Sequence, residues 1–139
     1  MRIDLPELKN PAFELSFPIR WGDMDVMGHV NNTVYFRYFE AIRIEWMVSV
    51  GATPNPQGEG PVIANTWCNF VHQLEYPGEV LGKLYLANPG RSSFDTFITL
   101  ERRDQPGRID AHGGATTVWV DFATHQSKTL PDWLRSRIG

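Results

Sequence analysis

Residues 33–50 read TVYFRYFEAIRIEWMVSV, and this stretch decides the fold because the helix it predicts is apolar on almost every face. Apolar side chains recur at intervals of four, the spacing of one helix face: Val34, Tyr38, Ile42 and Trp46. Other apolar residues fill the remaining faces, so we expect this helix to be buried on most sides. Asn31 or Asn32 is a favoured N-cap, and Gly51 followed by Pro54 predicts the helix end.

The segments on either side of this helix have the pattern of β-strands. Before it, apolar residues alternate with polar ones from Phe13 to Ile19, and Pro18 on the polar phase suits a sheet edge. After it, four further strands are expected, at 61–72, 79–88, 93–100 and 109–122. Gly113 and Gly114 suggest a bulge or a bend in the last strand, and a short helix is expected at 132–138.

The order of these elements predicts the architecture. Short turns join the last four strands, and short turns require antiparallel neighbours. A helix that is apolar on most faces needs a sheet curved around it. We therefore expect an α+β fold in which a curved, antiparallel, five-stranded sheet wraps around one long central helix. The 139 residues fit one domain, residues 1–139.

Composition excludes several classes of protein. The net charge is −3, without the local excess of Lys and Arg that nucleic-acid binders carry. No run of about 18 apolar residues predicts a membrane span, and no apolar leader predicts secretion, so a cytoplasmic protein is expected. Cys68, the one cysteine, reads as a small core residue. The four histidines lack metal-ligand spacing, so we expect no metal and no cofactor.

The segment before the central helix, residues 21–32, reads WGDMDVMGHVNN. It contains many side chains that can take part in catalysis: carboxylates, an imidazole and amides. The N-terminus of a helix has unpaired N–H groups and a partial positive charge, which can hold a developing oxyanion. Asp25 stands seven positions before Asn32, and Gly28 between them lets the loop fold back. A carboxylate placed there can attack a carbonyl or activate water.

Asp23-Met24-Asp25-Val26-Met27-Gly28-His29-Val30-Asn31-Asn32, with Tyr35 and Glu40 after it, resembles a motif of the hot-dog fold acyl-CoA thioesterases. The likeness is to the 4-hydroxybenzoyl-CoA thioesterase-like branch and extends from about Phe13 to about Ile138. The resemblance implies the hot-dog fold and a homodimer or homotetramer with active sites between subunits. It also implies an acyl-CoA substrate, with coenzyme A as part of that substrate.

The resemblance assigns roles to the motif residues. Asp25 matches the catalytic aspartate, as nucleophile or general base, and the N–H near Asn32 matches the carbonyl-polarising donor. His29 either braces the loop or orients the substrate carbonyl, and Asn31 caps the helix and can also touch the thioester. Asp23 is expected to be mainly structural. The acyl-ACP relatives have an asparagine where this chain has Met27, so the simpler aspartate and helix-dipole mechanism is favoured.

Substrate contacts are expected at two further places. The turn Gly90-Arg91-Ser92-Ser93 resembles the segment of the family near coenzyme A, with Arg91, Ser92 and Ser93 as ligands for phosphate or pantetheine. Tyr35 is a candidate to line the acyl pocket, with packing in the core as the alternative for most of the aromatic residues of this helix. Basic residues elsewhere are further phosphate candidates: Lys83, Arg102, Arg103 and Lys128. Glu40 is either a surface partner of Arg37 or Arg43 or a minor catalytic candidate.

The function expected from the sequence is hydrolysis of an acyl-CoA thioester to the free acid and coenzyme A. Two alternatives stay open at this point. One is an enzyme of the same fold with a different activity, such as a hydratase or an acyl-ACP thioesterase. The other is a non-catalytic module that binds acyl-CoA.

Overall fold

The computed structural model describes residues 3–8, 11–52 and 55–139. The described residues form six strands, one long helix and two short helical segments, in chain order: β1 (Phe13–Pro18), the 3₁₀ turn η1 (Trp21–Asp23), α1 (Asn32–Ser49), β2 (Glu59–Phe70), β3 (Glu79–Ala87), β4 (Ser93–Arg102), β5 (Ala111–Asp121), β6 (Gln126–Ser127) and α2 (Asp132–Ile138). The expected helices and the five expected long strands are all present. The two-residue strand β6 was not predicted from the sequence.

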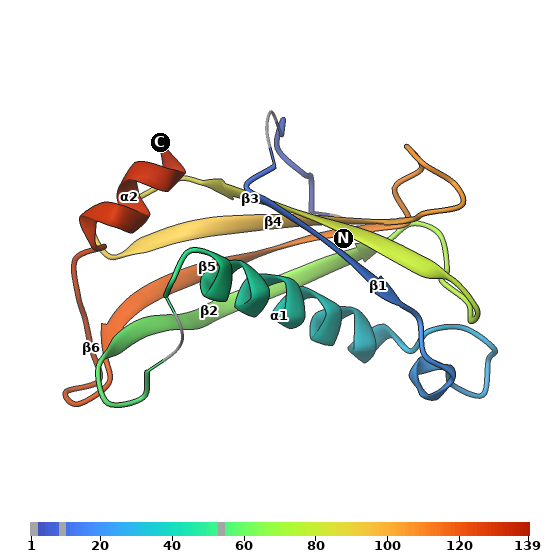
Figure 1. The fold of residues 1–139 in the computed structure, drawn as a ribbon, viewed down its shortest axis with the longest axis horizontal. Helices are drawn as coiled ribbons and strands as arrows, with labels where there is room; N and C mark the ends of the chain where they lie inside the picture. The colour runs from blue at the N-terminus through green and yellow to red at the C-terminus, as the bar shows by residue number, and fades with distance from the viewer. Residues whose placement is uncertain (1–2, 9–10, 53–54) are drawn as a thin grey trace.

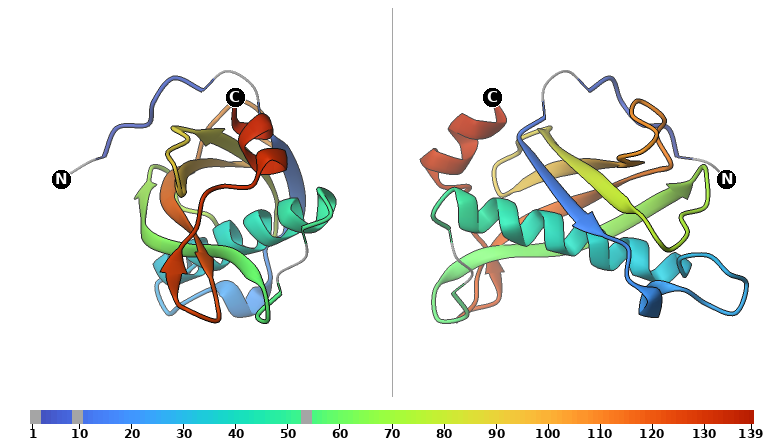
Figure 2. Two further views of the ribbon diagram at one scale, coloured as in Figure 1. Left: turned by 90° about the vertical axis from the view of Figure 1, so that its left-hand side faces the viewer. Right: turned by 45° about the vertical axis from the view of Figure 1, so that its right-hand side comes forward.

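All strand pairs are antiparallel, in the order β1-β3-β4-β5-β2, and β6 pairs with the end of β5. Pro18 lies in β1, which is an edge strand as expected. The sheet curves around α1, which runs across its concave face (Figure 1). Figure 2 shows the sheet and α1 from two further sides. The predicted α+β architecture is therefore confirmed.

Helix α1 begins at the predicted asparagine cap and ends before Gly51, as expected, while Pro54 lies outside the described residues. Asn31 is the N-cap, and its side chain accepts a hydrogen bond from the Thr33 N–H. The helix ends before Gly51, whose φ of 78° lies in the left-handed region that glycine adopts without strain. Six residues of α1 are buried in the core: Tyr35, Tyr38, Phe39, Ile42, Trp46 and Met47. Most of the aromatic residues of this helix thus pack beneath the sheet.

Two glycines bring α1 close to the sheet. A Cβ atom at Gly113 in β5 would lie 2.6 Å from the Phe39 ring and also against the Trp67 carbonyl oxygen. A Cβ atom at Gly82 in β3 would collide with the side chain of Ile42. The expected bulge at Gly113 and Gly114 was wrong, because both residues pair in regular register. Glycine occurs there to admit the helix, and the register shift lies in β2, between Ile63 and Asn65.

One face of α1 is open in this chain, which differs from the expectation of a helix buried on most sides. Ile44 is 41% exposed and Val48 is 49% exposed. The sheet of a single chain therefore covers only part of an apolar helix. Within the described residues, neither helix is both long and apolar enough to cross a membrane.

The close approach at Gly113 gives a stability prediction. We expect Gly113→Ala to lower the free energy of unfolding by about 1–3 kcal/mol, because the added methyl group must displace Phe39 or the backbone of β2. Urea denaturation measures this change. Gly22→Ala is the matched control, since a Cβ atom at Gly22 would have no neighbour within 4 Å. A Gly113→Ala protein as stable as wild type would show that α1 does not depend on this contact.

Candidate active site

The loop between η1 and α1 holds Asp25 in a tight turn. The Asp25 N–H donates to the His29 carbonyl oxygen over 3.0 Å, and the Gly28 N–H donates to the Asp25 carbonyl oxygen over 3.0 Å. Gly28 has a φ of 81°, which this turn requires. The Met27 N–H donates to Asp25 Oδ1 over 2.9 Å. The carboxylate of Asp25 is therefore fixed relative to its own backbone.

Asn31 joins this carboxylate to the start of α1. Its Nδ2 donates to Asp25 Oδ2 over 3.1 Å. Its Oδ1 accepts from the Thr33 N–H over 2.9 Å and from the Thr33 hydroxyl over 2.6 Å. The amide of one side chain thus sets the position of Asp25 and caps the helix at once. This contact joins Asp25 and Asn31, two residues that the sequence predicts to belong to the site.

The N–H of Asn32 lies at the positive end of the α1 dipole. The Thr33 N–H donates to Oδ1 of the cap residue Asn31, and the Val34 N–H donates to the Asn31 carbonyl oxygen over 2.9 Å. Among the described residues, the Asn32 N–H has no acceptor. Asn32 is the first residue of α1 and is exposed. The helix therefore presents one free donor next to the residue that holds Asp25.

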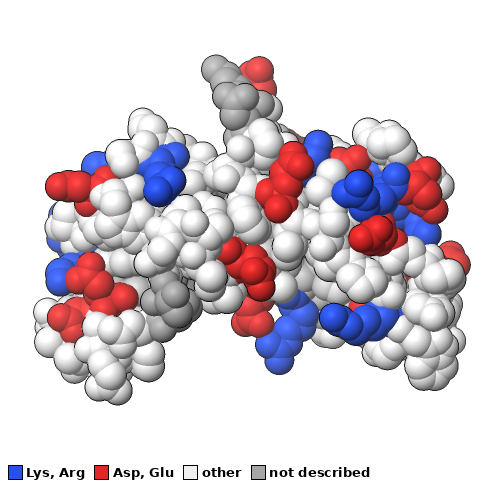
Figure 3. All heavy atoms as spheres, in the orientation of Figure 1, with Lys and Arg blue, Asp and Glu red and all other residues white. Residues whose placement is uncertain are grey.

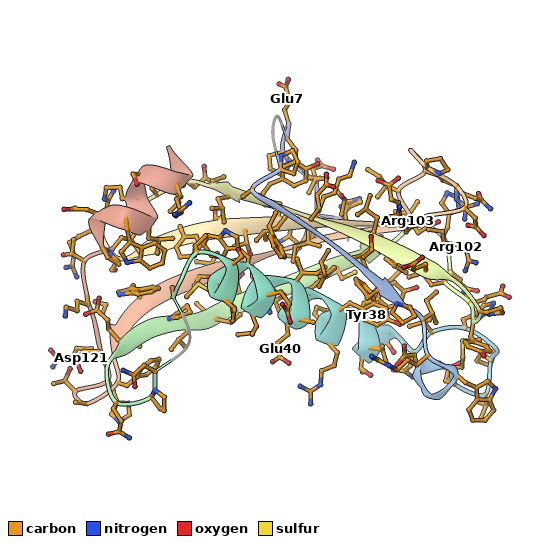
Figure 4. The ribbon with its side chains drawn as sticks, viewed as in Figure 1. Glu7, Tyr38, Glu40, Arg102, Arg103 and Asp121 are labelled. Carbon is orange, nitrogen blue, oxygen red and sulfur yellow. The ribbon has the colours of Figure 1, made fainter. Side chains whose placement is uncertain are left out.

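Asp23 has a structural role, as expected. Its Oδ2 accepts from the Tyr38 hydroxyl over 2.7 Å and from the Arg20 N–H over 2.9 Å. Burial, followed by the hydrogen bond to Asp23, raises the pKa of Tyr38, so the phenol stays protonated and remains a donor. Figure 4 labels Tyr38 on the part of α1 beside this loop. The pair ties the loop to the helix.

Two residues of the β2–β3 connection complete the support of the loop, and neither was predicted from the sequence. The Leu74 carbonyl oxygen accepts from the Val30 N–H over 2.8 Å, and the Leu74 N–H donates to the Tyr35 hydroxyl over 3.2 Å. His29 Nε2 lies 3.8 Å from Glu75 Oε1. No local sequence pattern predicts these contacts, because they join segments about forty residues apart in the chain.

Tyr35 itself is only 2% exposed, and its ring meets Phe70 edge-on at 4.9 Å between ring centroids. Burial is the main cause that raises the pKa of Tyr35. In this chain the side chain belongs to the core, directly beneath the loop that holds Asp25. The expected contact of Tyr35 with an acyl group stays a prediction.

The turn that contains Arg91, Ser92 and Ser93 lies at the other end of the sheet. Strand β3 separates this turn from the loop of Asp25, and its nine residues span roughly 30 Å at about 3.3 Å per residue. Figure 1 shows α2, which packs beside the turn, and the blue loop before α1 at opposite ends of the molecule. Arg91 donates to the hydroxyl groups of Thr129 and Ser127. One chain therefore does not bring the predicted coenzyme A ligands to Asp25.

The other basic candidates for phosphate contacts already have partners in the protein. Lys83 pairs with Glu101, Arg102 with Asp104, Arg103 with the Ser16 hydroxyl and Lys128 with Glu59. Figure 4 labels Arg102 and Arg103 at the end of the sheet near the loop. On the face drawn in Figure 3, basic and acidic side chains alternate, so no basic stripe crosses that face.

Two further candidates have the surroundings expected of structural groups. Glu40 Oε1 accepts from Arg37 Nη1 over 2.8 Å, which confirms the expected surface pair. Burial raises the pKa of Cys68 to about 12, so this thiol is not a ready nucleophile. Within the described residues no three His, Cys, Asp or Glu side chains come together as metal ligands.

The double role of Asn31 gives a prediction on stability. Asn31→Ala removes the cap of α1, and we expect a loss of about 1 kcal/mol in the free energy of unfolding. Asn31→Ser retains a capping oxygen. We therefore expect this variant to lose no more than a few tenths of a kcal/mol in the free energy of unfolding. Chemical denaturation of the two variants checks the difference. Equal stability of both variants and wild type would show that the cap contributes nothing to the fold.

Comparison with known proteins agrees with this geometry. The chain is similar to the PA2801 protein of Pseudomonas aeruginosa, whose name proposes a thioesterase. The two sequences are 33% identical and the two structures match with a TM-score of 0.90. The match covers 94% of this chain and 100% of that one. The XC229 protein of Xanthomonas campestris, whose name proposes an acyl-CoA thioesterase, is 30% identical with a TM-score of 0.78, covering 87% of this chain and 100% of that one.

A protein of uncharacterised function, YsmA of Bacillus subtilis (strain 168), is 29% identical over 75 residues. The match spans 52% of this chain and 51% of YsmA, about half the length of each. The family model of the thioesterase-like superfamily matches residues 19–138, which include both the loop of Asp25 and the whole of α1. The chain therefore belongs to the thioesterase-like superfamily, and its fold is the hot-dog fold.

Proposed function

We propose that this protein is an acyl-CoA thioesterase that hydrolyses R–CO–S–CoA to the free acid and coenzyme A. One observation carries the proposal: Asn31 holds the Asp25 carboxylate beside the N-terminus of α1, whose first N–H has no acceptor among the described residues. A carboxylate and an unpaired donor are the two groups that thioester hydrolysis needs. Membership of the thioesterase-like superfamily supports the same activity.

The free Asn32 N–H acts on the thioester oxygen. In the tetrahedral transition state negative charge moves onto this oxygen, and the N–H can donate to it at the positive end of α1. One such donor contributes about 3–4 kcal/mol to catalysis in known enzymes. The donor is preorganised, because Asn31 fixes the first turn of the helix. The helix therefore stabilises charge that develops only during the reaction.

Asp25 supplies the attacking group or activates it. As general base, its carboxylate takes a proton from water while the water oxygen bonds to the carbonyl carbon; the thiolate of coenzyme A then leaves and is protonated. As nucleophile, it attacks the carbonyl carbon and expels the coenzyme A thiolate, which is protonated; water then hydrolyses the resulting mixed anhydride to the free acid and restores the carboxylate. Each carboxylate oxygen has one hydrogen bond within the protein, and each retains a free lone pair. Both routes need only water and the thioester, without a metal or cofactor.

We also propose that the active enzyme is a homodimer or a larger homo-oligomer, joined through the outer edge of β2. This strand has twelve residues, its centre is exposed, and its outer side has no partner among the described residues. Val62 is 44% exposed, and Ile44 on the open face of α1 is 41% exposed. A second copy would cover both. A long unprotected edge favours pairing, and the separation of Arg91 from Asp25 fits a site that two chains complete.

The single cysteine fits a cytoplasmic setting, where thiols stay reduced. We propose the cytoplasm as the compartment of this reaction.

The catalytic proposal predicts the effect of Asp25→Asn. This variant keeps an acceptor for the Met27 N–H and should fold normally. We expect kcat to fall at least about a hundredfold, a loss of about 2.7 kcal/mol, because the carboxylate is gone. Thiol release from aryl, short-chain, medium-chain and long-chain acyl-CoAs measures kcat. Glu45→Gln, which changes an exposed carboxylate on α1, is the control and should retain activity.

Near-normal turnover by Asp25→Asn would remove this residue from the mechanism. Binding of acyl-CoA to wild type without release of thiol, for every member of the series, would support a non-catalytic binding module. Turnover of acyl-ACP in preference to acyl-CoA would identify the other carrier.

The dimer proposal predicts the effect of a lysine on the edge strand. Val62→Lys places a charge on the exposed edge, so we expect the monomer fraction to rise and thiol release to fall with it. Light scattering after size exclusion gives the mass. Ile109→Lys changes a residue of similar exposure, 38%, in the β4–β5 turn and should leave the mass unchanged. A wild-type monomer with full turnover would overturn the proposal.

A further inference from the structure

A cavity of about 140 Å³ lies beneath the second half of α1, between the helix and strands β2, β4 and β5. Most of its wall is apolar, with Met47, Ile63 and Phe94 among the lining residues. A dry cavity of about 150 Å³ can take a benzene molecule, so this one has room for a short segment of a small molecule. The residues of the catalytic loop do not line it.

Two hydroxyl groups at the floor of this cavity lack partners. Thr96 and Thr117 both line it, each is 2% exposed, and neither hydroxyl oxygen has a hydrogen-bond partner among the described residues. Thr96 pairs with Ala115 and Thr117 with Phe94, so the two threonines are diagonal neighbours on the concave face of the sheet. A buried polar group without a partner is costly. Two of them in one cavity indicate that something else bonds to them.

A cation lies at the wall of the same cavity. Arg43 lines it and is only partly exposed, and burial lowers the pKa of its guanidinium. Glu40 is the acid whose charge acts on Arg43, and it is hydrogen-bonded to Arg37. Within the described residues Arg43 itself has no hydrogen bond or close ion pair. Because arginine stays charged and carries only donors, it adds unused donors to the two hydroxyl groups.

We propose that this cavity binds the far end of the acyl group and selects acyl groups that carry an oxygen function there. The hydroxyls of Thr96 and Thr117 and the guanidinium of Arg43 can all donate to such an oxygen. The apolar wall meanwhile takes the adjoining carbon atoms. A plain alkyl group of the same length would leave all three polar groups unpaired. This inference rests on the proposed thioesterase function and names its substrate class.

The placement of the cavity along α1 sets the length of the acyl group. Glu40 and Met47, which both line the cavity, follow Asn32 by eight and fifteen positions. At about 1.5 Å per residue, the cavity begins roughly 12 Å along the helix from the free N–H. The oxygen function should therefore be well separated from the thioester, by a medium-length chain or by rings of similar length.

The test compares matched substrates that differ in one oxygen atom. Pairs of acyl-CoAs with six, eight or ten carbons, each plain or with a hydroxyl on the last carbon, are assayed for thiol release. For at least one length we expect wild type to prefer the hydroxylated member at least tenfold in kcat/KM. In the double variant Thr96→Val/Thr117→Val, which keeps the shape of both side chains, this preference should fall at least tenfold.

Thr116→Val is the matched control, since the Thr116 hydroxyl already donates to Asp95 Oδ1 and does not line the cavity. It should leave the preference as in wild type. Thermal unfolding of the double variant checks that it folds; the melting temperature should equal or exceed that of wild type, because two unpaired hydroxyl groups are removed.

The outcomes separate this inference from the proposed function. Equal turnover of both members at every length, or a preference that survives in the double variant, overturns the selection of oxygenated acyl groups and leaves the thioesterase intact. If wild type releases no thiol from any substrate, the thioesterase proposal fails. Calorimetric binding of the same pairs then tests the cavity by itself, and equal affinities for the two members would overturn it.

Discussion

The contact between α1 and the sheet is the constraint on which the rest of the molecule depends. Gly82 and Gly113 leave the space that Ile42 and Phe39 occupy, so the helix lies closer to the strands than any side chain at these positions would allow. The sheet can then curve around the helix and bury its aromatic residues. The position of the helix also fixes where its N-terminus emerges. The candidate catalytic donor is therefore located by packing that takes place two turns further along the helix.

The active-site loop depends on this helix in turn. Asp23 is held by Tyr38, and Asp25 is held by Asn31, so both carboxylates of the motif are bonded to α1 or to its cap. One of these acids serves the fold, and the other is the proposed catalytic group. The difference lies in their surroundings, because Asp23 accepts from a buried phenol while Asp25 keeps free lone pairs at the loop surface. These two aspartates, two positions apart in the sequence, thus differ in their proposed roles because their surroundings differ.

Much of the fold could be predicted from the sequence because its signals are local. The helix of residues 33–50, its asparagine cap and its glycine stop follow from periodicity and capping alone, and the strands follow from alternation and turns. The candidate site residues came from the resemblance of residues 23–32 to a family motif, which is also confined to one stretch of sequence. The function of Gly113 was not predicted, since only the three-dimensional structure shows that Phe39 lies against it. The support from Leu74 and Glu75 also depends on contacts between distant segments, which no single stretch of sequence displays.

The tethering of the loop has a consequence for its motion. Backbone hydrogen bonds link Asp25 to His29 and Val30 to Leu74, and the phenol of Tyr38 bonds the carboxylate of Asp23. Opening the loop would break these bonds together with the first turn of α1, so it belongs to the same cooperative unit as the helix. The hydrogen-bonded amide protons of Asp25 and Val30 should therefore exchange with solvent on the slow timescale of the core. Movement of Asp25 is thus coupled to the stability of α1.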